Sequence, residues 1–163
     1  MSDNPTSGRP AVSITNCQDI PVDDQALVML ASLVAESEGC ASGTEIGIIL
    51  VDEEEMAGLN LEAMGREEPT DVLSFPIEAC SPGFPPVTAV DGPPVLLGDV
   101  VIAPSYVKRR AAELGEEFSS EMALMVTHGV LHLFGYEHET EADAEIMEAR
   151  ERFILAQIGV SRK

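Results

Sequence analysis

The chain has 163 residues, 45% of them hydrophobic, so it is long enough to bury one core and too apolar to be disordered. Its formal net charge is -20, with 9 basic and 29 acidic residues, which argues against nonspecific binding to nucleic acid. The three widely spaced cysteines argue against a disulfide framework and favour a reducing cytoplasm.

The first half of the chain is predicted to alternate strands and helices. Residues 1–10 lack the apolar core of a secretory signal, and we expect a disordered leader there before a single domain over residues 11–163. Hydrophobic spacing, capping residues and prolines predict strands over 11–16, 45–51 and 69–76, with helices over 23–38 and 52–61. No apolar run approaches the roughly 20 residues that a membrane span needs, so no membrane association is expected.

The second half is predicted to be mainly helical. Six of the 11 prolines fall between residues 76 and 94, which predicts a long surface loop. A strand over 96–102 and helices over 104–114, 119–134 and 140–157 should follow. The helix over 119–134 is apolar on most sides and should therefore be buried. In the last helix, the residues expected to face inward are Ile146, Met147, Phe153 and Ile154.

The mixture of elements predicts the fold class. Strands and helices that follow one another in this way favour an α+β (mixed α/β) domain. We expect a small, mainly four-stranded mixed sheet packed against about five to six helices, with the apolar helix over 119–134 in the core.

All the histidines of the chain lie close together, at His128, His132 and His138. Helical residues four apart project from one face with Cβ atoms about 5–6 Å apart, so His128 and His132 can share one ion. Gly135 can adopt the left-handed conformation that turns the chain back and brings in His138. Three imidazoles with an open fourth position are typical of a catalytic metal. We expect one Zn2+ per chain, with nickel or another divalent transition metal as the alternative.

The same histidine spacing occurs in metzincin proteases, which place a catalytic glutamate directly after the first histidine. Gly129 stands at that position here, so a peptidase that uses that base is not expected. The alternative to a metal site is a set of core histidines, which would be costly to bury without hydrogen-bond partners.

The motif His128-Gly129-x-Leu131-His132-Leu133-x-Gly135-Tyr136-x-His138 resembles that of the YbeY family of metal-dependent endoribonucleases. The segments 69–76 (PTDVLSFP) and 97–100 (LGDV) and the pair Leu59-Asn60 agree with it. The resemblance extends from about residue 45 to about residue 153.

The resemblance implies a small mixed sheet with surrounding helices, distantly like the zinc proteases, and a zinc-type metal on the three histidines. It implies cleavage of single-stranded RNA in the maturation and quality control of small-subunit ribosomal RNA, in the cytoplasm. The implied partners are ribosomal RNA, a small-subunit ribosomal protein and a ribosome-associated GTPase. Many family members carry a phosphate-holding arginine four residues after the Asn of the Leu-Asn pair. Met64 occupies that position here, and Arg66 is the candidate replacement.

The catalytic candidates are His128, Glu137 and Arg66. Glu137 is the candidate base because it lies close to the ligands in sequence, and a solvated surface acid is its alternative role. Asp71 and Asp99 are candidates for orienting a ligand imidazole, or for a structural hydrogen bond to a turn.

Candidates for substrate binding are fewer. Thr70 and Ser74 are expected either to contact substrate or to complete a strand edge. The basic cluster Lys108, Arg109 and Arg110 is expected either to contact the RNA backbone or to form a solvated helix face. The large negative charge predicts weak, salt-sensitive affinity for free RNA, which a docking partner would offset.

Two other functions stay open on the sequence alone. One is a different metallohydrolase, such as a peptidase, against which Gly129 counts. The other is a non-catalytic ribosome assembly factor with a structural metal, which the Met64 departure favours.

Overall fold

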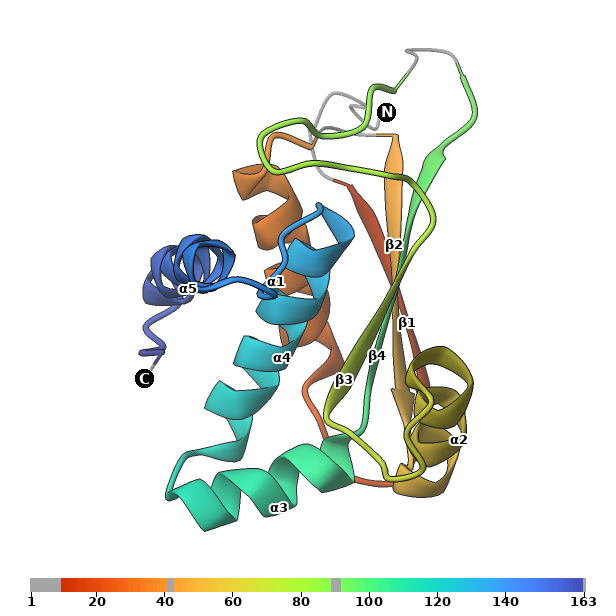
Figure 1. Ribbon diagram of the computed structural model, residues 1–163, viewed down its shortest axis with the longest axis vertical. Helices are drawn as coiled ribbons and strands as arrows, with labels where there is room; N and C mark the ends of the chain where they lie inside the picture. The colour runs from red at the N-terminus through yellow and green to blue at the C-terminus, as the bar shows by residue number, and fades with distance from the viewer. Residues whose placement is uncertain (1–9, 41–42, 89–91, 163) are drawn as a thin grey trace.

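The computed structural model describes residues 10–40, 43–88 and 92–162, which form one four-stranded sheet and five helices (Figure 1). The strands are β1 (Ala11–Cys17), β2 (Thr44–Val51), β3 (Val72–Pro76) and β4 (Val95–Ile102). The helices are α1 (Asp24–Ser37), α2 (Glu53–Met64), α3 (Pro104–Leu114), α4 (Phe118–Leu133) and α5 (Glu141–Ala156). The predicted α+β class with a four-stranded sheet is confirmed. Residues 1–9 of the expected leader lie outside the described residues.

The sheet is mixed because three parallel strands carry one antiparallel edge strand. Its order is β1-β2-β4-β3, in which β1 with β2 and β2 with β4 are parallel and β3 with β4 is antiparallel. Parallel neighbours need crossover connections, and α1 supplies the one between β1 and β2. Strand β3 is shorter than the predicted 69–76 and begins at Val72, which pairs with Ile102, the last residue of β4.

Short polar side chains and glycines set the ends of the helices. Asp23, Asp52 and Thr140 each precede a helix and accept a hydrogen bond from the backbone N–H three residues later. Gly65 and Gly115 take left-handed conformations directly after α2 and α3. The observed helix ends lie within one residue of the predicted ones, except that α2 extends past the predicted end at 61 to Met64, where Gly65 ends it.

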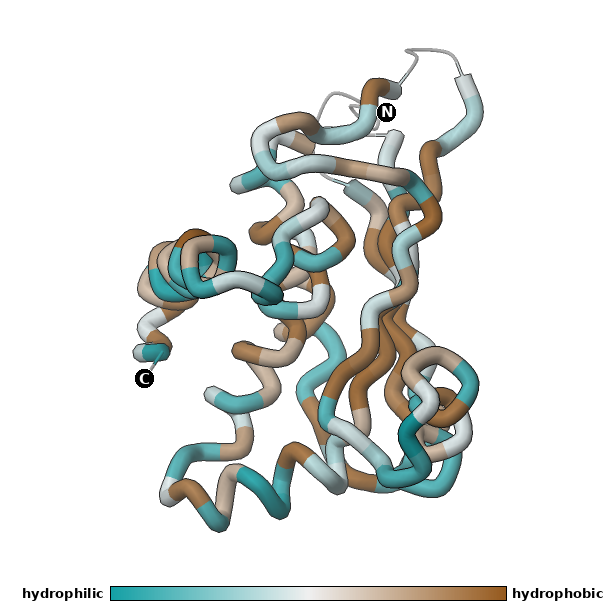
Figure 2. The backbone as a smooth tube through the Cα atoms, viewed as in Figure 1, coloured by the Kyte–Doolittle hydropathy of each residue, from teal (hydrophilic) through white to brown (hydrophobic). Residues whose placement is uncertain are grey.

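Each face of the sheet has its own core. Ile46, Ile48 and Leu50 of β2 pack with residues of α1 and α4. Ile49 and Val51 alternate with these residues along β2, so they point to the other face and pack with residues of α2. Figure 2 shows hydrophobic residues concentrated along the strands.

Helix α4 occupies the centre of the helical layer. It contacts β3 and β4 on one side and α1, α3 and α5 on its others, and α5 lies on the side of α4 away from the sheet (Figure 1). Its buried residues are Met122, Ala123, Val126, Thr127, Gly129, Val130, Leu131 and Leu133. The prediction that this helix is buried is confirmed.

The prediction for the inward face of the last helix is wrong for two residues. Met147 and Ile154 are buried, but Ile146 and Phe153 are each 55% exposed. The buried residues of α5 are Met147, Glu151, Ile154 and Leu155, spaced i, i+4, i+7 and i+8. A carboxylate, Glu151, therefore occupies the inward stripe.

The proline-rich stretch between β3 and β4 is a loop, as predicted. The described part of it holds one isolated bridge, between Ser81 and Phe84. The three cysteines are free thiols. Across the described ranges, none of the helices combines the length and the apolar character that crossing a bilayer requires.

Candidate metal centre

The end of α4 and the turn after it bring the three histidines together. His128 and His132 lie one helical turn apart on α4, and the helix ends at Leu133. Gly135 then takes a φ of +94°, which reverses the chain toward His138. A Cβ at position 135 would also collide with the carbonyl group of Cys80, in the loop after β3. Both the backbone conformation and the packing therefore require glycine here.

One ring nitrogen from each histidine points to a common region. These nitrogens of His128, His132 and His138 all lie within 4.8 Å of one another. The Nε2 atoms of His128 and His132 are 3.0 Å apart. Two nitrogens bound to a tetrahedral ion at about 2.0–2.1 Å would be about 3.3 Å apart, so the cluster has suitable dimensions.

The hydrogen bonds of the other ring nitrogens decide which atoms face the ion. His128 Nδ1 lies 2.6 Å from Glu151 Oε2, and His132 Nδ1 lies 2.7 Å from the Tyr136 carbonyl oxygen. Each of these oxygens accepts a hydrogen bond from Nδ1–H, which leaves the lone pair of a neutral ring on Nε2. Two lone pairs 3.0 Å apart repel each other unless a cation lies between them. The donor set therefore fits a divalent transition metal.

Glu151 lies behind His128 and is buried, with 1% of its side chain exposed. Its second carboxylate oxygen accepts a hydrogen bond from Arg162 Nε at 2.6 Å. Burial by itself raises the pKa of Glu151, but the hydrogen bonds from His128 and Arg162 outweigh it and place the pKa below the ordinary carboxyl value. The residue is therefore a carboxylate at neutral pH and a strong acceptor for the His128 ring.

A second buried carboxylate lies behind Tyr136. The Tyr136 hydroxyl donates to Glu38 Oε1 at 2.6 Å, and Arg150 forms an ion pair with Glu38 Oε2 at 2.6 Å. Burial, followed by the bond to Glu38, raises the pKa of Tyr136 to about 12, so the hydroxyl keeps its proton. Burial, followed by the charge of His128, lowers the pKa of His132 to about 4. That ring is therefore neutral and ready to bind a metal at neutral pH.

Gly129, directly after His128, faces the sheet. A Cβ at this position would overlap Val100 of β4 and lie 3.3 Å from Cγ2 of Val72 in β3. The Ser74 hydroxyl donates to the Gly129 carbonyl oxygen at 2.9 Å and holds β3 against the helix. The close approach of α4 to the sheet leaves no room for a glutamate here.

Comparisons with known proteins show the family to which the chain belongs. The family model described as endoribonuclease YbeY matches residues 14–159. The chain belongs to the endoribonuclease YbeY family. The family expected from the histidine motif is thereby confirmed.

Several curated relatives carry the name endoribonuclease YbeY. The protein from Desulforamulus reducens is 39% identical over 156 residues, which cover 93% of this chain and 99% of the relative. The protein from Moorella thermoacetica is 41% identical over 154 residues, covering 92% and 98%. The solution structure of TM1509 from Thermotoga maritima matches with a TM-score of 0.55 and 24% identity, covering 90% of this chain and 91% of that one. This last likeness shows the fold.

Among the catalytic candidates of this YbeY-family chain, Glu137 lies beside the histidines. Its side chain is 55% exposed, and its Oε2 is 3.8 Å from His132 Nδ1, too far for a hydrogen bond. Glu137, His132 and residues 76–80 line a cavity of about 270 Å³. Arg66 is exposed beyond the end of α2, and no ion pair involves it within the described part of the chain.

The polar candidates on the strands have partners other than the histidines. Asp71 accepts hydrogen bonds from the Val72 N–H at 2.8 Å and from the Thr70 hydroxyl at 3.3 Å. Asp99 lies on the sheet face opposite α4, where its carboxylate covers Gly47. Within residues 10–40, 43–88 and 92–162, no hydrogen bond joins Asp71 or Asp99 to a histidine.

The basic cluster on α3 is partly neutralised. Arg109 forms hydrogen bonds of 2.9 and 2.8 Å to both carboxylate oxygens of Glu53 in α2. Arg110 lies 3.5 Å from Glu113. Lys108 has no ion pair with any residue that the structure describes. Of the three, Lys108 is therefore the cation with the fewest ion pairs to residues that the structure describes.

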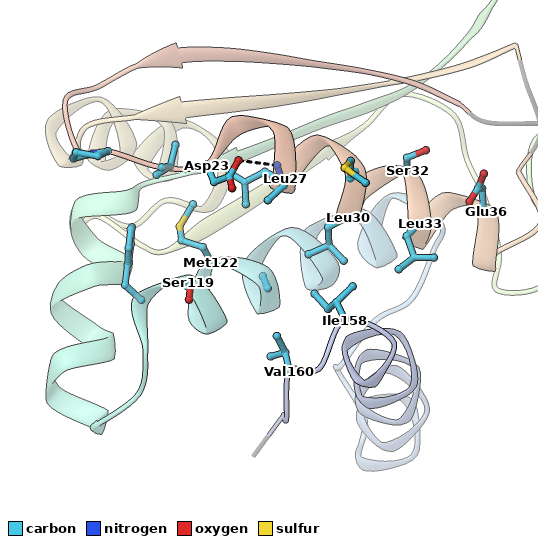
Figure 3. A pocket seen from close by; sticks show the side chains of 16 residues that line it. Asp23, Leu27, Leu30, Ser32, Leu33, Glu36, Ser119, Met122, Ile158 and Val160 are labelled. Atoms are coloured by element: carbon cyan, nitrogen blue, oxygen red, sulfur yellow. Dashed lines mark hydrogen bonds between the residues drawn. The ribbon is translucent and has the colours of Figure 1, made fainter.

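A larger cavity of about 870 Å³ lies away from the histidines, between α1, the start of α4 and the segment after α5. Figure 3 shows Leu30 and Leu33 of α1 facing Ile158 and Val160 across it. Its walls are mainly apolar, and no histidine or cysteine lines it. Of these two cavities, only the smaller one is lined by a histidine, His132.

Sequence reasoning missed four residues that support the centre: Glu38, Arg150, Glu151 and Arg162. Glu151 had a usable signal, because an acid spaced i+4 from Met147 and i−3 from Ile154 must share their buried face. The other three residues had no comparable signal in the sequence. Glu38 and Arg150 are distant from each other in sequence, and Arg162 lies beyond the end of α5.

Proposed function

We propose that this chain is a metal-dependent endoribonuclease that cleaves single-stranded RNA during maturation and quality control of small-subunit ribosomal RNA, in the cytoplasm. The observation that carries the proposal is the convergence of three imidazoles in a YbeY-family chain: one ring nitrogen of each lies within 4.8 Å of the others, and the Nε2 atoms of His128 and His132 are 3.0 Å apart. Relatives that the chain covers over nearly their whole length are named endoribonucleases.

The proposed cofactor is one Zn2+ held by His128, His132 and His138, with nickel or another divalent transition metal as the alternative. When bound, such an ion supplies a Lewis acid at the phosphodiester and a source of activated water at neutral pH. Glu151 and the Tyr136 carbonyl hold the protons on the far side of two rings, which keeps both rings in the orientation and tautomer that a ligand needs.

The proposed base is Glu137. Its exposed carboxylate lines the cavity beside His132 and can take a proton from a water there. The proposed phosphate contacts are Arg66 and Lys108, whose charges are not neutralised by ion pairs within the described part of the chain. Roles for Thr70 and Ser74 at the substrate, and for Asp71 and Asp99 in orienting a ligand imidazole, stay predictions.

The proposed partners follow from the charge of the surface. Four exposed acidic side chains lie on α5 or in the turn before it: Glu139, Glu141, Asp143 and Glu145. An acidic face of this kind is complementary to a basic small-subunit ribosomal protein and repels free RNA. We therefore propose that docking to such a protein, and to a ribosome-associated GTPase, places the enzyme on ribosomal RNA.

The test is RNA cleavage by the purified chain, with a chelator and with zinc added back. Single-stranded RNA should be cut, the chelator should stop cleavage and zinc should restore it. His128→Ala should lose bound zinc and activity, whereas Ile146→Ala, an exposed change on α5, should keep both. Cleavage of casein with RNA left intact would refute the proposal in favour of a peptidase.

A non-catalytic assembly factor is the second candidate, because Met64 replaces the family arginine and Glu53 neutralises Arg109. Complementation of a strain that lacks the gene separates the two. Catalysis requires that a folded, zinc-free His128→Ala chain fail to restore ribosomal RNA maturation. Full restoration by that variant would favour the assembly factor.

A further inference from the structure

Three segments distant in sequence meet at Glu38, which follows the last residue of α1. Its side chain is 4% exposed. Glu38 Oε1 accepts from the Tyr136 hydroxyl at 2.6 Å, and Oε2 accepts from Arg150 Nε and Nη2 at 3.0 and 2.6 Å. Arg150, on α5, also donates to the Ser37 carbonyl oxygen at 3.1 Å. The end of α1, the turn after α4 and α5 are thus joined by one set of charged hydrogen bonds.

Tyr136 links this set to the histidines. Its carbonyl oxygen accepts from His132 Nδ1 at 2.7 Å, and His138 follows two residues later. The Tyr136 N–H bonds the Leu131 carbonyl oxygen at 3.2 Å, so α4 holds one side of the residue and Glu38 holds the other. Between these anchors the carbonyl has one orientation, toward the His132 ring.

We propose that Glu38 and Arg150 are positioning residues of the metal centre, acting on His132 through Tyr136. The inference rests on the proposed metal site but not on the proposed reaction. Gly135 has no side chain that could anchor the turn, so the next residue, Tyr136, supplies the side-chain anchor. Without the hydroxyl anchor, the Tyr136 carbonyl and the His132 ring would sample several orientations, and the ion would be bound less tightly.

The test measures the zinc Kd of the full chain by competition with a chromophoric chelator, well below the melting temperature. Tyr136→Phe removes the hydroxyl alone, and Glu38→Ala removes its acceptor. Each should raise the Kd about tenfold, the lower end of the effect known for groups that support metal ligands. Glu53→Gln breaks the Glu–Arg pair between α2 and α3 and should leave the Kd unchanged.

The double variant distinguishes positioning from general destabilisation. If Glu38 acts through the hydroxyl, Glu38→Ala should have no further effect on the Kd in the Tyr136→Phe background. The visible spectrum of the cobalt-substituted protein should change in Tyr136→Phe and not in Glu53→Gln. Arg150→Lys, which keeps one charged donor, should bind zinc more tightly than Arg150→Met.

Wild-type zinc affinity and an unchanged cobalt spectrum in folded Tyr136→Phe would overturn the proposal, even if Glu38→Ala fails to fold. Additive effects in the double variant would overturn it as well. A chain that binds zinc as expected in every variant but cuts no RNA would refute the proposed function and leave this inference standing.

Discussion

Two regions of the molecule carry the same chemical pair in different surroundings. Beside the histidines, Glu151 and Glu38 have 1% and 4% of their side chains exposed, and each is paired with an arginine. Between α2 and α3, Glu53 pairs with Arg109, with 26% and 51% of the side chains exposed. The buried carboxylates depend entirely on their protein partners, whereas water also solvates the exposed pair.

The difference shows where this chain uses buried charge. Burying an ion pair is costly unless every lone pair and proton finds a partner. Beside the histidines, the additional partners are the His128 ring, which bonds Glu151, and the Tyr136 hydroxyl, which bonds Glu38. The two buried ion pairs therefore orient a proposed metal ligand and the residue behind another one. The pair between α2 and α3 joins two helices and touches no histidine. His138 is exposed, and no described hydrogen bond fixes its ring.

The largest effect on stability is expected from Glu151→Gln. The change removes the charged acceptor of Arg162 Nε, although Arg162 Nη2 keeps Glu148 at 3.3 Å, and it weakens the bond to His128. Breaking a buried ion pair costs about 3–5 kcal/mol. The zinc Kd should also rise by about ten- to a hundredfold. Urea unfolding and zinc competition measure the two effects. An unfolding free energy equal to that of the wild type would remove the contrast between buried and exposed pairs.

Removal of the metal should have the next largest effect. Zinc at about a hundredfold its Kd stabilises a folded chain by about 2.7 kcal/mol when the unfolded chain does not bind it. A chelator should therefore lower the melting temperature of the wild type and leave that of His128→Ala unchanged. Equal responses in both proteins would mean that the ion is held elsewhere.

Gly135→Ala tests the glycine turn beside the histidines, and Gly115, the glycine that follows α3, serves for comparison. The φ of +94° and the collision with Cys80 should together cost about 2 kcal/mol. Gly115, after α3, also has a positive φ, but a Cβ added there would meet no atom within 4 Å, so Gly115→Ala is the matched control. Thermal unfolding should show a smaller loss for Gly115→Ala, and zinc affinity should fall only for Gly135→Ala. Equal losses would argue against tight packing of the turn.

Glu53→Gln should have the smallest effect, a slight fall in melting temperature at neutral pH. The hydrogen bond from Arg109, opposed by partial burial, lowers the pKa of Glu53 below its ordinary value of 4.5. The stabilisation is therefore full above that value and is lost as the pH falls through the lowered pKa. The difference in melting temperature between wild type and variant should shrink in acid, and a difference that grows in acid would contradict this assignment.

Much of the fold could be predicted because the signals are local. Capping residues such as Asp52 and glycines such as Gly115 mark helix ends within a few residues of where they act. The inward face of α5 was predicted in part wrongly, because Ile146 and Phe153 were ranked by hydrophobicity alone. The helical period selects Met147 and Ile154, and with them Glu151.

In the candidate site, too, the residues close in sequence could be predicted and the distant ones could not. The three histidines lie within a few turns of chain, so their spacing predicted that they converge, as the structure shows. The residues behind them come from afar: Glu38 lies 98 positions before Tyr136, and its pairing depends on how α1 packs on α4. No spacing rule reaches that far. Roles at the substrate depend on a bound RNA, which sequence patterns do not describe.

The position of Arg162 has a practical consequence. This residue lies beyond α5, near the last position of the sequence, yet its guanidinium contacts the carboxylate behind His128. A preparation cleaved between α5 and Arg162 would retain every histidine, and we expect it to bind zinc poorly. Intact mass should therefore be checked before any metal titration of this chain is interpreted.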